Sequence, residues 1–132
     1  MKRLRKFLLR DRGSAPVEFV MTGILLSLIT LGVLQLSLSV YVRNTVIDAV
    51  AEGARYASLA DHNLSDGIVR SRELISASLG PGFEVELRAS QSEVLGSPAI
   101  RVDAVAALPV LGIWGVFGTM EVHAVSAREL RH

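Results

Sequence analysis

The chain has 132 residues, of which 50% are hydrophobic, and its mean hydropathy is +0.41. These values are too high for an ordinary soluble domain unless one segment holds a large share of the apolar residues. The sequence contains no cysteine, which excludes disulfides, iron–sulfur clusters and thiol nucleophiles. The formal net charge of +1 hides a basic beginning and a mildly acidic remainder.

The first 13 residues form a basic stretch in which Asp11 is the only acidic residue. A basic stretch can bind nucleic acid, but this one has Phe7 as its only aromatic residue and an apolar segment follows it. Positively charged flanks of membrane helices stay in the cytoplasm. We therefore expect a cytoplasmic N-terminus, contact with a membrane and no nucleic-acid partner. The basic residues are Lys2, Arg3, Arg5, Lys6, Arg10 and Arg12.

The apolar segment covers residues 19–42, which include no charged side chain. As a helix these 24 positions would extend roughly 36 Å, enough for a bilayer core of about 30 Å. A secretory signal has a shorter apolar core, of about 7 to 15 residues, before a small-residue cleavage site. The 90 residues that follow are too few to enclose such a helix as a soluble core. We predict one transmembrane helix over residues 14–42, between a leader at 1–13 and an extracytoplasmic domain at 43–132.

The helix is expected to continue beyond the membrane to about residue 60. Small and apolar residues recur there at steps of three and four, and charged residues take the other face. A turn-rich linker follows, and Asp66 is a candidate cap for a second helix that Gly80-Pro81-Gly82 would end. The apolar set is Val46, Ala49, Val50, Gly53, Ala57 and Ala60, and the polar set is Arg43, Asn44, Asp48, Glu52 and Arg55.

Alternating apolar residues predict three strands, near residues 83–87, 100–106 and 120–126. An antiparallel meander covered on one face by a helix would give an α+β fold. The apolar run 108–118 is too short to span a membrane. It is either a connection packed on its own sheet or an exposed interface loop, with Trp114 and Phe117 as its aromatic residues.

The motif that bears on function runs from Arg10 to Phe19, where four residues separate Gly13 from Glu18. An ionised carboxylate within the hydrocarbon costs about 2.5 to 3.5 kcal/mol, so Glu18 needs either a partner or a position at the headgroups, near a helix N-terminus. This segment resembles the type IV prepilin pattern. The resemblance implies that a prepilin peptidase cuts between Gly13 and Ser14, and that Glu18, followed by Phe19, pairs with the free amine of a neighbouring subunit.

A second resemblance covers residues 10–60. The motif, the apolar helix, Tyr41-Val42-Arg43-Asn44 and then Ala51-Glu52-Gly53-Ala54-Arg55-Tyr56-Ala57 are similar to the TadE-like pseudopilins of tight-adherence pili. This resemblance implies a single-pass protein of the bacterial cell membrane whose partners are other pilins or pseudopilins. It also implies assembly without a cofactor or a small-molecule substrate.

Small residues mark one side of the apolar helix: Gly23, Ser27, Thr30 and Ser37 fall within roughly 80° of arc at 3.6 residues per turn. Such a stripe is a candidate helix-packing face, although a helix rich in Gly and Ser often shows one by chance.

Catalysis has little support, because the three histidines are far apart in the sequence and no nucleophile or phosphate-binding motif occurs. The close carboxylates Asp48 and Glu52 lie beside Arg55, as expected for a solvated helix face. We therefore predict no catalytic, metal or cofactor site. Two other functions stay open: an uncleaved single-pass binding or accessory module of an envelope secretion complex, and a membrane-tethered enzyme.

Overall fold

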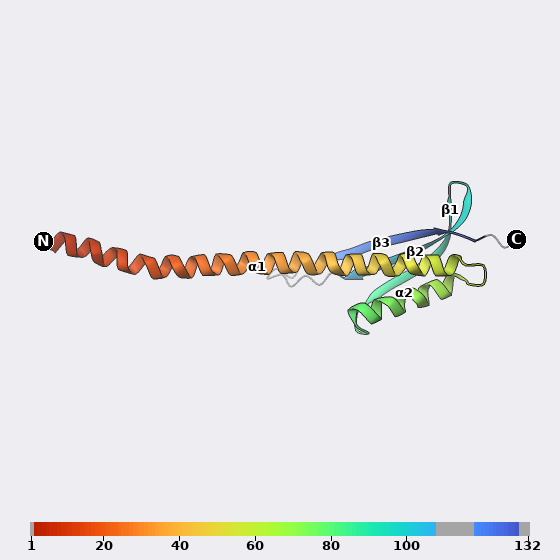
Figure 1. Cartoon of the computed structure of the whole chain (residues 1–132), viewed down its shortest axis with the longest axis horizontal. Coiled ribbons are helices and arrows are strands. Elements are labelled where there is room, and N and C mark those ends of the chain that lie inside the picture. The colour runs from red at the N-terminus through yellow and green to blue at the C-terminus, as the bar shows by residue number, and fades with distance from the viewer. Residues whose placement is uncertain (1, 108–117, 130–132) are drawn as a thin grey trace. The chain divides into compact units, whose positions relative to one another are not determined.

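A computed structural model of the chain describes residues 2–107 and 118–129, with side chains from Gly13 onward. The order of the elements is α1 (Lys2–Ser58), α2 (Leu64–Leu79), β1 (Val85–Val94), β2 (Ser97–Ala107) and β3 (Thr119–Ala127) (Figure 1). The chain divides into two compact units, residues 1–36 and 37–132, and α1 contributes to both. The predicted α+β class and its three antiparallel strands are confirmed.

Helix α1 differs from its predicted range at both ends. It begins at Lys2, because the basic stretch is also helical, and it ends at Ser58, two residues before the predicted end. The backbone then turns tightly: Leu59 N donates to Tyr56 O at 3.3 Å and His62 N donates to Leu59 O at 3.1 Å. Pro16 therefore lies inside a helix rather than in a first turn.

Helix α2 begins at a capping box whose N-cap is Asn63, so the assignment of this role to Asp66 was wrong. Asn63 Oδ1 accepts hydrogen bonds from Ser65 N (2.9 Å) and Asp66 N (3.1 Å), and Asp66 Oδ2 accepts one from Asn63 N at 2.9 Å. Asp66 is thus the third helical residue, and its carboxylate accepts the reciprocal hydrogen bond of the capping box, from the backbone N–H of the N-cap residue. At the other end Gly80 has φ 93° and donates to Ser76 O at 3.0 Å, which confirms the predicted stop.

Replacing Asn63 by alanine is expected to lower the free energy of unfolding by about 1 kcal/mol, because two backbone donors of α2 lose their acceptor. The exposed Ser78 of the same helix provides the control, since Ser78→Ala should leave stability unchanged or slightly raised. Thermal unfolding of the detergent-extracted chain, followed by circular dichroism, gives both values. Equal melting temperatures for the two variants would contradict the capping role.

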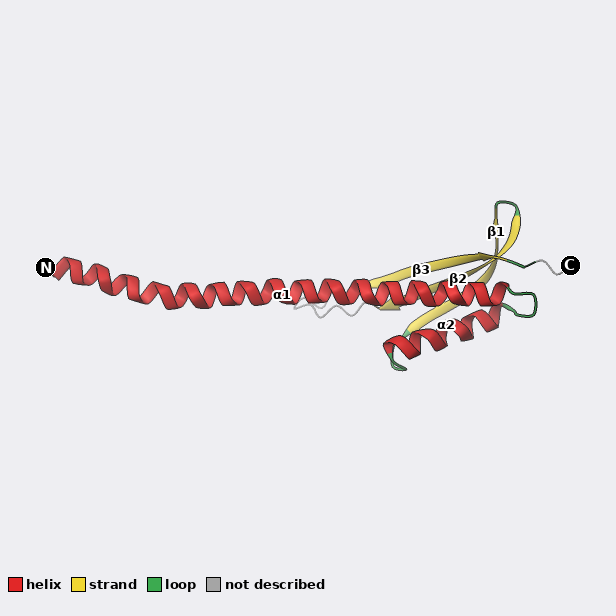
Figure 2. Ribbon diagram, viewed as in Figure 1, coloured by secondary structure: helices red, strands yellow, loops and turns green. Residues whose placement is uncertain are grey.

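The sheet is a meander in the order β1-β2-β3. Leu87, Ala104 and Val122 form one cross-strand row on its buried face, and Arg88, Asp103 and His123 form the neighbouring row on its outer face. Figure 2 shows α2 and the strands beside the same stretch of α1. The core of this unit comprises Val42, Val46, Ala49, Val50 and Ala54 of α1, Ile75 of α2, and Leu87, Val102, Ala104, Ala106, Met120 and Val122 of the sheet. The prediction that a helix covers one face of the sheet is confirmed, and both α1 and α2 contribute to that cover.

Candidate functional site: the exposed apolar helix

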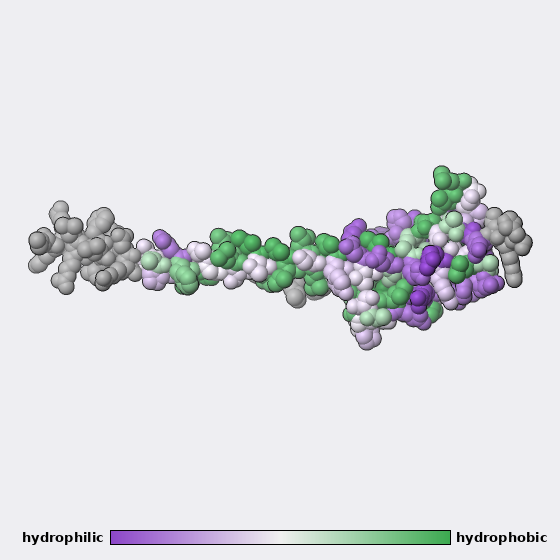
Figure 3. All heavy atoms as spheres, in the orientation of Figure 1, coloured by the Kyte–Doolittle hydropathy of each residue, from purple (hydrophilic) through white to green (hydrophobic). Residues whose placement is uncertain are grey.

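The first half of α1 presents apolar side chains to its surroundings on every side. None of its most apolar window is buried, and this is the one helix of the described residues that is long and apolar enough to cross a membrane. Figure 3 shows hydrophobic residues along this stretch. The large exposed side chains are Val17, Phe19, Val20, Met21, Ile24, Leu25, Leu26, Leu28, Ile29, Leu31, Val33, Leu34, Leu36, Leu38, Val40 and Tyr41. A helix that is apolar all round must find an apolar environment outside its own chain.

The environment of α1 changes at Val42. Tyr41 is 54% exposed, whereas Val42 is 3% exposed and belongs to the core. The charge-free stretch also ends here, because Arg43 is the next residue. The apolar helix surface therefore stops where α1 begins to pack on the rest of its own unit, and beyond Val42 the predicted amphipathic pattern is confirmed.

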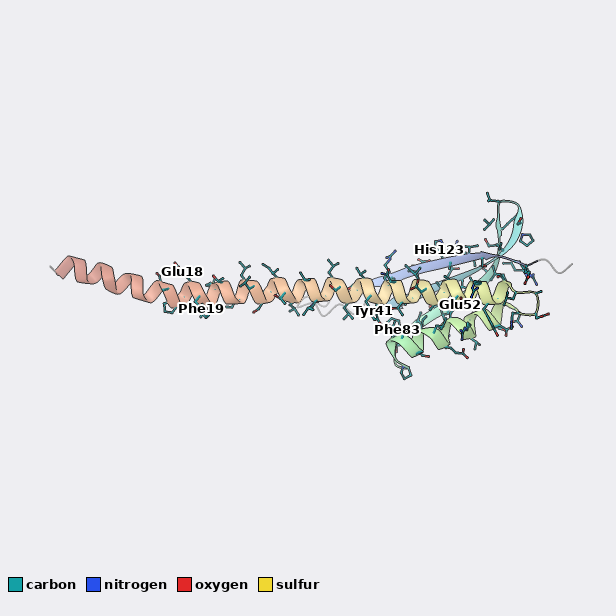
Figure 4. The ribbon with its side chains drawn as sticks, in the orientation of Figure 1. Glu18, Phe19, Tyr41, Glu52, Phe83 and His123 are labelled. Carbon is teal, nitrogen blue, oxygen red and sulfur yellow. The ribbon has the colours of Figure 1, made fainter. Side chains whose placement is uncertain are left out.

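Glu18 lies at the beginning of the apolar stretch, exposed and next to the 80% exposed Phe19 (Figure 4). It is the only charged residue between Gly13 and Val42. A side chain added at Gly13 would meet no heavy atom within 4 Å, so the described structure gives no packing reason for glycine at this position.

The small-residue stripe is exposed along its whole length: Gly23, Ser27, Thr30 and Ser37 all reach the surface. Ser27 Oγ donates to Gly23 O and Thr30 Oγ1 donates to Leu26 O, each at 2.8 Å. These hydroxyl groups can therefore enter an apolar environment without an unsatisfied donor. The stripe remains a predicted packing face.

A close helix contact lies in the part of α1 that follows Val42. A Cβ atom on Gly53 would be 1.8 Å from Ser71 Oγ and 2.6 Å from Gly67 O, and a Cβ on Gly67 would be 2.7 Å from that of Ala57. The missing side chains of the two glycines thus allow α1 and α2 to touch through their backbones. We missed this contact in the sequence, although two glycines inside predicted helices are a signal of close approach.

The charged face of α1 confirms the prediction for Asp48 and Glu52. Asp48 is exposed, and Glu52 accepts two hydrogen bonds from Arg55: Nε to Oε2 at 3.0 Å and Nη2 to Oε1 at 3.1 Å. This pairing lowers the pKa of Glu52. The pair therefore stabilises the fold at neutral pH and is lost as the pH falls through that lowered pKa. Both groups reach solvent, so the contribution is small.

The histidines lie in separate places. The His62 ring stacks on Tyr56 with centroids 4.0 Å apart, and its Nδ1 lies 3.4 Å from Asp66 Oδ2. His123 is exposed on the outer face of β3 (Figure 4), and His132 is outside the described residues. Trp114 and Phe117 of the predicted interface loop are also outside them. Among the residues that the structure describes, no group of three His, Asp or Glu side chains could hold a metal ion.

Part of the chain matches a known protein family. Residues 13–55 match the family model described as TadE-like protein, which confirms the family resemblance drawn from the sequence. The matched segment begins at Gly13 and includes the whole exposed apolar stretch and Gly53. No curated protein and no solved structure matches the chain.

Proposed function

We propose that this chain, TadE-like over residues 13–55, is a pseudopilin-like subunit for the biogenesis of a tight-adherence, type IV-like pilus. It is anchored in the bacterial membrane by residues 14–42 of α1, with the basic leader 1–13 in the cytoplasm and residues 43–132 outside. A prepilin peptidase removes the leader between Gly13 and Ser14. The mature helix then associates with the helices of other pilins, so the chain acts by packing and charge pairing rather than by catalysis.

The observation that carries this proposal is the exposed, charge-free surface of α1 with one carboxylate, Glu18, at its beginning. A membrane provides the apolar environment that this surface requires. An ammonium group of a neighbouring subunit would compensate the carboxylate, because opposite charges attract strongly where the dielectric constant is low. The terminal amine created by cleavage at Gly13 is such a group.

Pro16 supports leader removal through backbone energetics. Inside a helix, proline lacks the N–H that would bond to the preceding turn, and its ring clashes with the carbonyl there, at a cost of about 3 kcal/mol or more. In the first helical turn this cost disappears, because the N–H has no partner to lose. Pro16 lies inside α1 of the uncleaved chain, and cleavage after Gly13 would place it third. Removal of the leader therefore relieves an unfavourable position.

Processing is tested by intact mass and N-terminal sequencing of the membrane-extracted protein, expressed with and without a prepilin peptidase. We expect a chain beginning at Ser14 only when the peptidase is present. Gly13→Leu should abolish cleavage. Gly32→Leu is the matched control, because Gly32 lies in the same helix with open space around it, and this variant should be cleaved normally.

Retention of residues 1–13 in the native host would contradict the processing step. The chain would then be the alternative, an uncleaved single-pass protein whose outer unit is a binding or accessory module of an envelope secretion complex. Carbonate extraction of the same membranes tests anchoring separately, because an integral helix stays in the pellet whether or not the leader is removed.

A further inference from the structure

The connection between α1 and α2 leads into the tripeptide Asn63-Leu64-Ser65. Asparagine, any residue except proline, and then serine or threonine form the acceptor motif for N-linked glycans on surface loops of exported proteins. The chain has one other asparagine, Asn44, and the residues after it, Thr45-Val46, do not complete the motif. The sequence therefore contains a single candidate acceptor, in the part of the chain that the proposed function places outside the membrane.

The acceptor side chain is accessible in the folded chain. Asn63 is exposed, and Figure 2 shows the loop between α1 and α2 at the end of both helices, outside the packed helices and strands. Asp61 is also exposed and places a carboxylate two residues before the acceptor, where a cation of a glycan transferase can bind it. A glycan on Asn63 would therefore extend into solvent without displacing any residue of the core.

The hydrogen bonds of Asn63 leave its reactive atom available. Its Oδ1 accepts from Ser65 N, Ser65 Oγ and Asp66 N, whereas its Nδ2 makes no hydrogen bond to the residues that the structure describes. Three donors on Oδ1 draw electron density toward this oxygen, which makes a proton on Nδ2 easier to lose. N-glycosylation keeps the carbonyl oxygen of the amide. The modification of Nδ2 is therefore compatible with the capping box of α2.

We propose that Asn63 is an N-glycosylation site, an inference that rests on the extracytoplasmic placement of residues 43–132 in the proposed function. The donor is a glycan linked to a polyprenyl diphosphate, because outside the cell membrane a lipid-linked donor is retained whereas a soluble sugar nucleotide would diffuse away. Asn63 Nδ2 attacks the anomeric carbon of the glycan. The new C–N bond forms as the C–O bond to the diphosphate breaks. The diphosphate leaves with the electron pair, and the amide nitrogen loses one proton.

Intact mass and peptide fragmentation of the protein from membranes of its native host test this site. We expect the chain to be heavier than its sequence by the mass of a glycan, and fragmentation to place that mass on Asn63. Asn44 is the internal control, because it is exposed but lies outside the motif, and it should be unmodified. An unmodified Asn63 would overturn the proposal, and so would a glycan on Ser65 in its place.

Three variants remove the motif without removing the cap of α2. Asn63→Asp keeps an oxygen acceptor at the N-cap but lacks Nδ2. Leu64→Pro places proline at the first helical position, where it is tolerated, yet breaks the motif. Ser65→Ala keeps the backbone N–H that bonds to Asn63 and removes the hydroxyl. All three should lose the glycan and keep the circular dichroism of the parent chain, whereas Ser65→Thr should stay modified. A glycan retained by Leu64→Pro or Ser65→Ala would overturn the proposal.

A cysteine label separates failure of this site from failure of the proposed function. The chain has no cysteine, so Ser90→Cys, at an exposed position of β1, can be labelled with a maleimide that does not cross an intact cell membrane. We expect labelling together with a glycan on Asn63. Labelling with an unmodified Asn63 would overturn the glycosylation site alone. An unlabelled Ser90→Cys would overturn the extracytoplasmic placement and, with it, this site.

Discussion

Gly53→Ala is expected to lower the free energy of unfolding of the second unit, residues 37–132, by about 1 to 3 kcal/mol, the usual cost of overpacking. The new Cβ would stand 1.8 Å from Ser71 Oγ and 2.6 Å from the Gly67 carbonyl oxygen, so α2 must move away from α1. Alanine favours a helix over glycine by about 1 kcal/mol, which offsets only part of this cost. Denaturant unfolding and hydrogen exchange of the α2 amides in the detergent-extracted chain measure the change.

Two further variants show whether the helix contact causes the loss. Gly82→Ala places a Cβ in open space, so it should change stability by less than about 0.5 kcal/mol. Adding Ser71→Gly to Gly53→Ala removes the nearer clash and should recover part of the stability, while the Gly67 carbonyl still obstructs full recovery. If Gly53→Ala were as stable as the parent chain, α1 and α2 would not touch through their backbones.

Glu18→Gln should prevent assembly while leaving the leader cleavable. In the proposed assembly Glu18 pairs with an ammonium group of a neighbouring subunit. Removing one member of such a buried ion pair costs about 3 kcal/mol or more, which corresponds to roughly a hundredfold loss of association. The measurement is the amount of mature subunit that co-purifies with its pilin partners, normalised to the amount in the membrane. Processing at Gly13 is checked in the same samples by intact mass.

Glu52→Gln is the matched control, since it makes the same chemical change in the same helix, at a solvent-screened pair with Arg55. Its assembly should equal that of the parent chain. If Glu18→Gln assembled equally well, Glu18 would need no counter-charge. A position at the hydrated headgroups would then explain why a carboxylate is tolerated at the beginning of the apolar helix.

The sequence predicted the elements best where buried residues recur at a fixed spacing. The alternation in Val102, Ala104 and Ala106 predicted the central strand, and the spacing of Val46 and Val50 predicted the face of α1 that packs on it. Strand β1 runs to Val94, well past its predicted end at residue 87. The prediction stopped too early because the polar second half of the strand shows no alternation of apolar and polar residues. The two-residue Leu95-Gly96 turn that joins β1 to β2 was missed because leucine is not a residue that such turns favour.

At the candidate site, the exposure of the apolar helix could be predicted because no polar face interrupts residues 19–42. The contact between Gly53 and Gly67 was missed: the two glycines signal a close approach, but nothing in the sequence shows which helix faces meet. Assigning the N-cap to Asp66 failed for a related reason: Asn63 and Asp66 both favour helix starts, and only the backbone conformation distinguishes the N-cap from the third helical residue.

The link between Ser58 and Ser126 has a consequence for the order of folding. These residues are 68 positions apart, and Glu129 N also donates to Ser58 O at 2.9 Å. The second unit, residues 37–132, therefore closes only after its last strand has been synthesised, and contacts of such long range slow folding. Until then the apolar face of α1 at Val46 and Val50 is not fully covered by the sheet. A nascent chain stalled before β3 should therefore aggregate or require a chaperone.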